Sequence, residues 1–276
     1  GNRAGAIEAL RQACQAPGVP AVYHSNFGEM LRQEGRLAEA EQHARRAVTL
    51  DPNLVGAWNN LGIVLQESGQ LDEARRCLEK VIASEPGNAS AHNNLGNTLK
   101  RLDDLSGAER CWRRALELLP GYAEPYSNLA NLYREQGQYE QALAFGEQAI
   151  QLKPGLLDAY INLAAIETAR FRHQAARAWL DRLLQLAPDH AVALAARAGT
   201  AKELDEFDAA IVDANRAASL TPDNAEVQSA LASVLLASGS FEAAIAAFDR
   251  ALAVPSAIRE RVLVSRAMAF QENCHI

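Results

Sequence analysis

The feature that most constrains the fold of this chain is a proline that recurs every 34 residues. Six prolines stand at this spacing: Pro52, Pro86, Pro120, Pro154, Pro188 and Pro222. A fixed period of this length is typical of a solenoid, in which each repeat is one supersecondary unit that packs on its neighbours. The 276 residues are therefore expected to form stacked repeats, and not the two globular domains that length alone would suggest.

Aligning the repeats with this proline as position 32 gives seven copies over residues 21–255. They start at Ala21, Val55, Ala89, Ala123, Leu157, Ala191 and Ala225. Apolar residues at positions 4, 7, 8 and 11 predict a first helix, and those at positions 17, 20, 24 and 27 predict a second helix. Position 20 is always alanine and position 8 is always glycine or alanine, so the two helices can pack closely. Each repeat is therefore predicted to be an antiparallel helix pair.

The segments that flank the repeats are predicted to be helical as well. Residues 1–20 match the second helix of a truncated repeat, with Ala6, Leu10 and Ala13 on its apolar stripe. Residues 256–276 are predicted to form a closing helix and a tail, because a terminal repeat needs its apolar outer face covered. Since the chain opens inside a repeat, we expect further repeats or another domain upstream.

Composition excludes several classes of function. Acidic side chains number 34 against 27 basic ones, so no broad basic surface for nucleic acid or an anionic membrane is expected. No stretch has the roughly 18 to 20 continuous apolar residues of a membrane span. The four cysteines form no CxxC pair and are expected to be reduced thiols in a cytoplasm. The strong excess of arginine over lysine indicates a bacterial genome.

The chain contains no familiar motif for catalysis, for cofactor binding or for metal binding. Phosphate-binding glycine loops, nucleophile elbows and zinc-binding histidine pairs are all absent from the sequence. His24 and His92 stand at position 4, which carries an aromatic residue such as Trp58 in other repeats, so both are predicted to be packing residues. The chain is therefore predicted to have no enzymatic activity of its own, no cofactor and no metal.

The repeat resembles that of the tetratricopeptide repeat (TPR) family, whose pattern is W-x2-L-G-x2-Y, then A-x3-F, then P. The second copy matches most clearly, with Trp58, Leu61 and Gly62 in its first helix, Ala74 in its second helix and Pro86 at its end. The resemblance covers all seven copies. It implies an all-α fold, a right-handed superhelical solenoid of stacked antiparallel helix pairs. It also implies that the first helices line a concave groove in which an extended segment of a protein or peptide partner binds.

Two functions agree with this resemblance. The favoured one is a non-catalytic scaffold that binds a protein or peptide partner in its concave groove. The alternative is a substrate-recruiting TPR arm of a larger enzyme, of the glycosyltransferase or sulfotransferase type. Neither nucleic acid nor a membrane is expected as a partner, and the sequence leaves the partner's identity and a homo-oligomer open.

A row of asparagines lies on the face of the first helices opposite their packed stripe. Position 6 holds Asn26, Asn60, Asn94, Asn128 and Asn162 in the first five repeats. Asparagine is roughly 0.5 kcal/mol worse than alanine inside a helix, so five copies on one predicted solvent-side row need a cause. The row is similar to the superhelical arm of O-linked N-acetylglucosamine transferases, which implies that these amides hold the main chain of a bound peptide. Two alternatives stay open: common descent of the copies, or hydrogen bonds to a neighbouring helix.

Repeats 3 and 4 carry the fullest set of polar groups on this face. Position 9 adds Asn97 and Asn131, and position 12 adds Lys100 and Arg134. These cations favour a partner segment that is acidic or bears a carboxylate. The pattern departs from the carboxylate clamp of chaperone-tail-binding TPR domains, which needs lysine where Asn93 stands.

Two charged residues interrupt the packing stripes. Glu167 stands at position 11 of repeat 5 and Arg197 at position 7 of repeat 6, where most copies carry leucine. Because a lone buried charge is costly, the two residues are predicted to form an ion pair between consecutive first helices. The alternative is that Arg197 lays its aliphatic stem on the interface and extends its head to water. Repeat 5 also departs from the pattern at position 15, where Phe171 replaces the usual glycine or aspartate.

Overall fold

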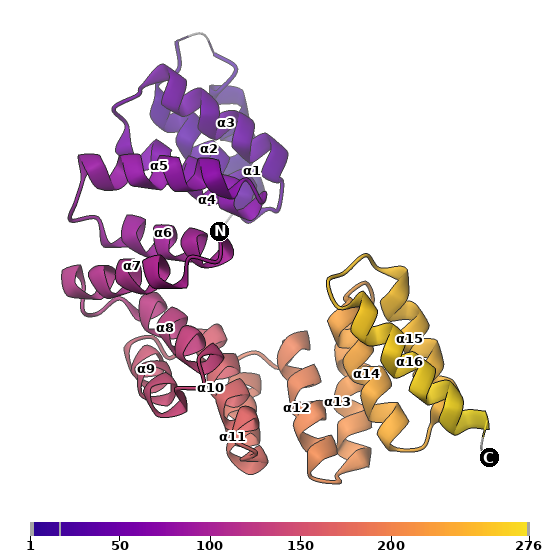
Figure 1. The fold of residues 1–276 in the computed structure, drawn as a ribbon. Helices are drawn as coiled ribbons and strands as arrows, with labels where there is room; N and C mark the ends of the chain where they lie inside the picture. The colour runs from indigo at the N-terminus through magenta and orange to yellow at the C-terminus, as the bar shows by residue number, and fades with distance from the viewer. Residues whose placement is uncertain (1–2, 17, 275–276) are drawn as a thin grey trace. The chain divides into compact units, whose positions relative to one another are not determined.

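The computed structural model describes residues 3–16 and 18–274, and every regular element in these residues is an α-helix (Figure 1). The sixteen helices of this described part are α1 Arg3–Ala13, α2 Ala21–Gln33, α3 Leu37–Leu50, α4 Val55–Glu67, α5 Leu71–Ser84, α6 Ala89–Arg101, α7 Leu105–Leu118, α8 Ala123–Glu135, α9 Tyr139–Leu152, α10 Leu157–Ala169, α11 His173–Leu186, α12 Ala191–Glu203, α13 Phe207–Leu220, α14 Ala225–Ala237, α15 Phe241–Ala253 and α16 Arg259–Cys274. The predicted all-α fold of stacked antiparallel helix pairs is confirmed.

The seven first helices are α2 and every second helix up to α14, and each begins at the first position of its repeat. A first helix packs on the second helix of its own repeat, as α2 does on α3 and α12 on α13. Three pairs of consecutive first helices also contact each other: α2 with α4, α4 with α6 and α12 with α14. A repeat therefore completes its hydrophobic core only against its neighbours.

The turn inside each helix pair requires a residue with positive φ at position 15. Gly69 adopts φ 80° there, a conformation that glycine reaches without strain. The next residue, Gln70, then donates its backbone N–H to the carbonyl of Leu65 at 2.9 Å, which closes the first helix. The non-glycine residues held in the same conformation are Asp103, Phe171 and Asp205, with φ of 64°, 57° and 59°.

Small residues let the two helices of a pair approach closely, as the sequence predicts. The alanine at position 20 is 0% exposed in every repeat. In repeat 3 the indole of Trp112, 1% exposed, lies over Gly96, where an added Cβ would come within 2.6 Å of the indole Nε1. Position 8 is therefore small where position 24 carries a large ring.

The chain divides into two compact units, Gly1–Leu132 and Tyr133–Ile276, and the division falls inside α8. Residues 1–2, 17 and 275–276 of the two flanking segments lie outside the described residues, and so does the side chain of Ala6. None of the described helices is both long enough and apolar enough to cross a membrane.

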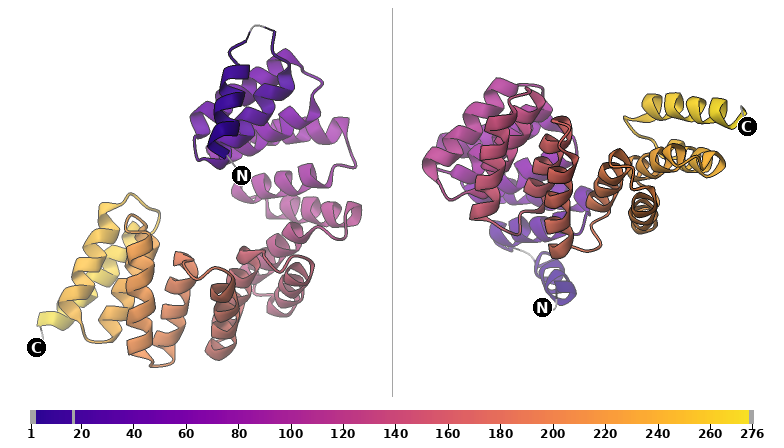
Figure 2. Two further views of the ribbon diagram at one scale, coloured as in Figure 1. Left: turned by 180° about the vertical axis from the view of Figure 1, so that it is seen from behind. Right: turned by 90° about the horizontal axis from the view of Figure 1, so that it is seen from below.

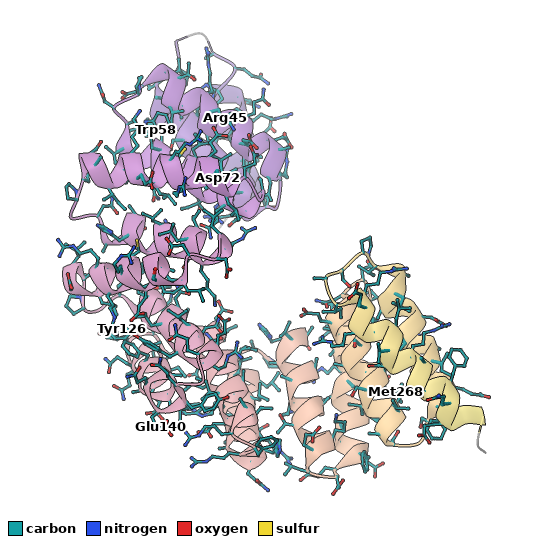
Figure 3. All side chains as sticks on the ribbon, in the orientation of Figure 1. Arg45, Trp58, Asp72, Tyr126, Glu140 and Met268 are labelled. Atoms are coloured by element: carbon teal, nitrogen blue, oxygen red, sulfur yellow. The ribbon has the colours of Figure 1, made fainter. Side chains whose placement is uncertain are left out.

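Helix α16 packs beside α15 at the end of the second unit (Figure 2). Its inner face buries Val262 and Ala269. Four other apolar side chains of this helix stay between 41% and 57% exposed, among them Met268 (Figure 3): Leu263, Val264, Met268 and Phe270. The closing helix therefore covers α15 without presenting a wholly polar surface of its own.

The predicted ion pair between Glu167 and Arg197 is wrong. The guanidinium of Arg197 on α12 binds both carboxylate oxygens of Asp213 on α13, at 2.6 and 2.8 Å, and Asp181 on α11 at 2.8 Å. The bonds to Asp213, opposed by burial, raise the pKa of Arg197. Arg197 points toward the second helices on either side, whereas the predicted pair joined charges on two first helices. Its head is held by carboxylates, so the alternative of a free head in water does not hold either.

Glu167 is left buried without its expected partner. Its side chain is 7% exposed, and its Oε2 atom has no hydrogen-bond partner among the described residues. Because a buried unsatisfied oxygen costs about 1–3 kcal/mol, Glu167→Leu is expected to raise the free energy of unfolding by a similar amount. Leucine already stands at this position in four repeats, for example as Leu65. Denaturant unfolding measures the change.

The matched control is Glu79→Leu on α5, where the glutamate is exposed and a change within about 0.5 kcal/mol is expected. A Glu167→Leu protein that unfolds at lower denaturant than the wild type would show that the buried carboxylate stabilises the fold.

Candidate functional site

Asparagines at position 6 connect neighbouring first helices. Asn60 Nδ2 on α4 donates to Ser25 Oγ on α2 at 3.0 Å. Asn94 Nδ2 on α6 donates to Asn59 Oδ1 on α4 at 3.2 Å. Each bond joins position 6 of one repeat to position 5 of the repeat before it. In repeat 4, Asn128 Nδ2 continues the series by donating to Asn93 Oδ1 at 3.0 Å.

These bonds correct the predicted placement of the row on the solvent side. Asn60, Asn94 and Asn128 are half-buried between helices, whereas Asn26 at the start of the row is exposed. The hydrogen bonds to a neighbouring helix, an alternative that the sequence left open, account for asparagine at three of the five positions. A helical wheel of one repeat cannot reveal them, because the acceptor lies in the preceding repeat.

Asn97 also has a role inside the protein. Its Oδ1 accepts hydrogen bonds from Trp112 Nε1 at 2.9 Å and from Asn128 Nδ2 at 2.8 Å. The three side chains come from α6, α7 and α8, so one amide oxygen connects two consecutive repeats. The remaining predicted groups are half-buried, and each has an interaction partner within the protein: Lys100, Asn131, Arg134 and Asn162. Arg134 and Asn162 belong to the second unit, and the other predicted groups belong to the first.

Three of the four cations at position 12 are paired with carboxylates. Arg32 Nη2 lies 2.7 Å from Glu29, and Lys202 Nζ lies 2.9 Å from Glu203. Arg134 is 3.7 Å from Glu135, its neighbour in sequence. A cation that already has an anionic partner attracts a second carboxylate less strongly. The geometry therefore gives no support to the predicted preference for an acidic segment.

A cleft of about 630 Å³ opens between the first helices α10 and α12 in the second unit. Here positions 6 and 9 carry Ala196, Ala165 and Gly199, which leave space where other repeats place asparagine. The walls are mainly apolar and are completed by Ile161, Ala164, Thr168, Ala169, Phe171, His173, Leu180, Thr200, Lys202 and Glu203. The sequence shows that repeat 6 lacks asparagine at position 6, but the pattern within one repeat does not predict a cleft.

Phe171 lies at the rim of this cleft with an exposed side chain and an energetically unfavourable backbone conformation. Its side chain is 84% exposed and its backbone is left-handed, with φ 57°. A side chain in that conformation costs roughly 1–2 kcal/mol relative to glycine, which four other repeats place at this position. An exposed aromatic ring also gains nothing from burial in the free protein. Strained residues of this kind are typical of binding sites.

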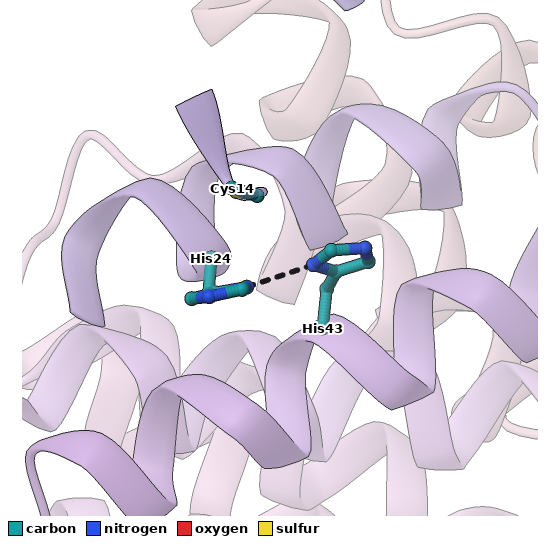
Figure 4. Close-up of side chains that lie close together, drawn as sticks. All are labelled: Cys14, His24 and His43. Atoms are coloured by element: carbon teal, nitrogen blue, oxygen red, sulfur yellow. Dashed lines mark hydrogen bonds between the residues drawn. The ribbon is translucent and has the colours of Figure 1, made fainter. Parts of the chain in front are cut away.

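One group of side chains in the described residues could hold a metal ion. A ring nitrogen of His24, a ring nitrogen of His43 and the thiol of Cys14 all lie within 4.8 Å of one another (Figure 4). Burial lowers the pKa of both histidines, and burial raises the pKa of the Cys14 thiol. His24 is buried, as predicted for a packing residue, but the repeat pattern does not predict that it lies beside the other two side chains.

Comparison with known proteins identifies the repeat. Models of the tetratricopeptide repeat match residues 1–54 and 196–258, residues 31–95 and 133–199, and residues 87–154. No curated protein matches the chain.

Solved structures with a similar fold come from several sources. A tetratricopeptide repeat protein from Parabacteroides merdae shares 17% identity at TM-score 0.69, over 91% of this chain and 98% of its own. The APC/C hetero-tetramer Cut9–Hcn1 gives 20% identity and TM-score 0.75, over 87% of this chain and 48% of that one. Yeast Tom70 gives 17% identity and TM-score 0.70, over 99% of this chain and 59% of that one. At these identities the likeness shows the fold alone.

Proposed function

Because this chain belongs to the tetratricopeptide repeat family, whose fold is typical of scaffolds for protein–protein interaction, we propose that it binds an extended segment of a partner protein along its first helices. An apolar side chain of the segment inserts into the cleft between α10 and α12. The observation that carries this proposal is the exposed, left-handed Phe171 at the rim of an apolar cleft. Inserting an apolar group would bury the ring and the cleft walls together, which favours binding.

The asparagine row has a secondary role in this proposal. Asparagine offers both donors and an acceptor, so amides that hold neighbouring helices can also bind the main chain of a segment. We assign this role to the seven asparagines predicted from the sequence: Asn26, Asn60, Asn94, Asn97, Asn128, Asn131 and Asn162. The two predicted cations, Lys100 and Arg134, have donors only and would bind main-chain carbonyls of the same segment. Main-chain contacts of this kind do not select a sequence, so selectivity comes from the apolar cleft.

The test uses random peptides displayed on phage and selected on the purified chain. Selected peptides are expected to share an apolar residue, and their Kd is measured on two variants. Phe171→Gly removes the ring and relieves the strain of the left-handed backbone conformation at this position. Gly199→Leu fills the cleft, since a Cβ at Gly199 meets nothing within 4 Å. Both variants are expected to raise Kd by about tenfold or more while the thermal midpoint stays unchanged or rises.

Matched controls lie in the first unit. Asp103→Gly changes the same turn position as Phe171, and Gly56→Leu adds a side chain where a Cβ also meets nothing within 4 Å. Both controls are expected to keep wild-type affinity. Peptides that bind the Phe171→Gly and Gly199→Leu proteins as tightly as the wild type, or a selection that enriches none, would contradict the cleft as the binding site.

A further inference from the structure

We propose that Cys14, His24 and His43 form a binding site for a borderline-soft divalent transition metal ion, with zinc as the expected occupant. The site lies in the first unit and does not depend on the cleft between α10 and α12. Its donors are one thiolate sulfur and two imidazole nitrogens. This set suits zinc and neighbouring transition metals and does not suit Mg²⁺ or Ca²⁺, which prefer oxygen.

The two histidine nitrogens lie near the spacing that a shared ion needs, and the Cys14 sulfur must move closer to them by up to about 1.2 Å. The two Nδ1 atoms of His24 and His43 lie 2.9 Å apart, and all three donor groups lie within 4.8 Å of one another (Figure 4). In tetrahedral zinc coordination, two nitrogen ligands are about 3.3 Å apart, and a nitrogen and a sulfur ligand are about 3.6 Å apart. Movement of a few tenths of an ångström would therefore separate the nitrogens enough for an ion to replace the shared proton.

The fold brings the three ligands together from two helices and from the residue that follows a third. His24 lies on α2 and His43 on α3, and these helices approach closely at Gly28. An added Cβ at Gly28 would lie 3.1 Å from the carbonyl oxygen of Ala40 and 3.6 Å from Cβ of His43. Cys14 follows α1 and keeps the helical pattern by donating its backbone N–H to Leu10 at 2.9 Å.

The histidine rings are held in place by their surroundings. The ring of Phe27 packs edge-on against His43, with ring centroids 4.5 Å apart. His24 is 7% exposed, and its ring lies nearly parallel to that of His43, at 25°. Ligands whose orientation is fixed before the ion arrives lose less freedom on binding. Three protein ligands leave a fourth coordination position for water or another small ligand.

Repeat 3 provides a natural comparison. Its positions 4 and 23 carry His92 and Cys111, where repeat 1 carries His24 and His43. No third donor joins His92 and Cys111 in a metal-sized group among the described residues, and the position of α5 that corresponds to Cys14 carries Ile82. The site therefore depends on the third donor from the truncated repeat.

The experiment is a zinc titration of the metal-free chain under reducing conditions, followed by calorimetry. Cobalt serves as a spectroscopic probe, since a thiolate ligand gives a charge-transfer band in the near ultraviolet. We expect one zinc ion per chain, a thiolate–cobalt band, and a thermal midpoint that zinc raises. Cys14→Ser is expected to remove the band. Cys14→Ser, His24→Gln and His43→Ala should each weaken zinc binding by at least about tenfold, because losing even an outer-shell partner costs that much.

Glutamine and alanine are chosen because repeat 7 carries Gln228 and Ala247 at the same two positions. The matched controls are His92→Gln, Cys111→Ser and the double change of Cys274→Ser with His275→Ala, all expected to bind zinc as the wild type does. The proposal is overturned if the wild type binds no zinc, if Cys14→Ser keeps the cobalt band, or if a control variant loses binding as fully as the three site variants.

Discussion

Trp112→Ala is expected to lower the free energy of unfolding by about 3–5 kcal/mol, the range found for truncating a fully buried aromatic side chain. The indole is 1% exposed and fills the space over Gly96. Its Nε1 also donates to Asn97 Oδ1 at 2.9 Å, and this oxygen accepts a second bond from Asn128. Alanine would leave a cavity between α6 and α7 and would remove one of the two bonds that hold Asn97. Denaturant unfolding followed by far-ultraviolet circular dichroism measures the loss.

Trp179→Ala is the matched control, because that tryptophan is only half-buried and should cost less. A compensating variant tests the packing argument directly. Trp112→Leu combined with Gly96→Ala reproduces the pair that repeat 5 carries as Ala164 and Leu180. It is expected to recover most of the stability, to within about 1.5 kcal/mol of the wild type. Equal losses for Trp112→Ala and Trp179→Ala would show that the indole is not a core element of the first unit.

Arg197→Leu is expected to cost about 3 kcal/mol, the lower end of the range for breaking a buried ion pair. The lower end applies because the arginine side chain is 28% exposed, although that of Asp213 is only 12% exposed. Leucine would leave the Asp213 carboxylate half-enclosed without its two hydrogen bonds, which are 2.6 and 2.8 Å long. The midpoint of denaturant unfolding is the measurement.

Removing both charges should restore stability. Arg197→Leu with Asp213→Ala copies repeat 7, which carries Leu231 and Ala247 at these positions, and it is expected to be neutral or stabilising. Asp181→Ala is the control: that carboxylate is 42% exposed, so its loss should cost less than about 1 kcal/mol. A coupling energy near zero between Arg197 and Asp213 in the double-mutant cycle would contradict the assignment.

The outcome for Arg197 shows where a repeat pattern stops being informative. The sequence identified Arg197 and Glu167 as departures from an apolar stripe, and both do lie at packed positions. It assigned the wrong partners because a helical wheel ranks the faces of one helix and does not say which neighbouring side chain reaches a given face. Asp213 lies 16 residues away on the next helix and Asp181 lies 16 residues away on the helix before.

The asparagine row and the histidine cluster show the same limit. Asparagine at position 6 was recognised as costly, and its partners, such as Ser25 for Asn60, lie 35 residues earlier in the chain. His24 was predicted to be a packing residue from its repeat position, which its burial supports. Nothing in that position indicates that His43 and Cys14 converge on it, since their spacing matches no metal motif.

The sequence by itself determined the helix pairs, their starts at each 34-residue interval, the small residues at positions 8 and 20, and the glycine or aspartate at position 15 of most repeats. These features follow from the geometry of one helix and one turn, so a local pattern specifies them. Only the tertiary structure decided the partners of Arg197, the bonds of the asparagine row, the cleft beside Phe171 and the meeting of Cys14 with two histidines. Each of these depends on side chains from different helices, whose relative rotation and separation are set by packing across the whole stack and not by any single repeat.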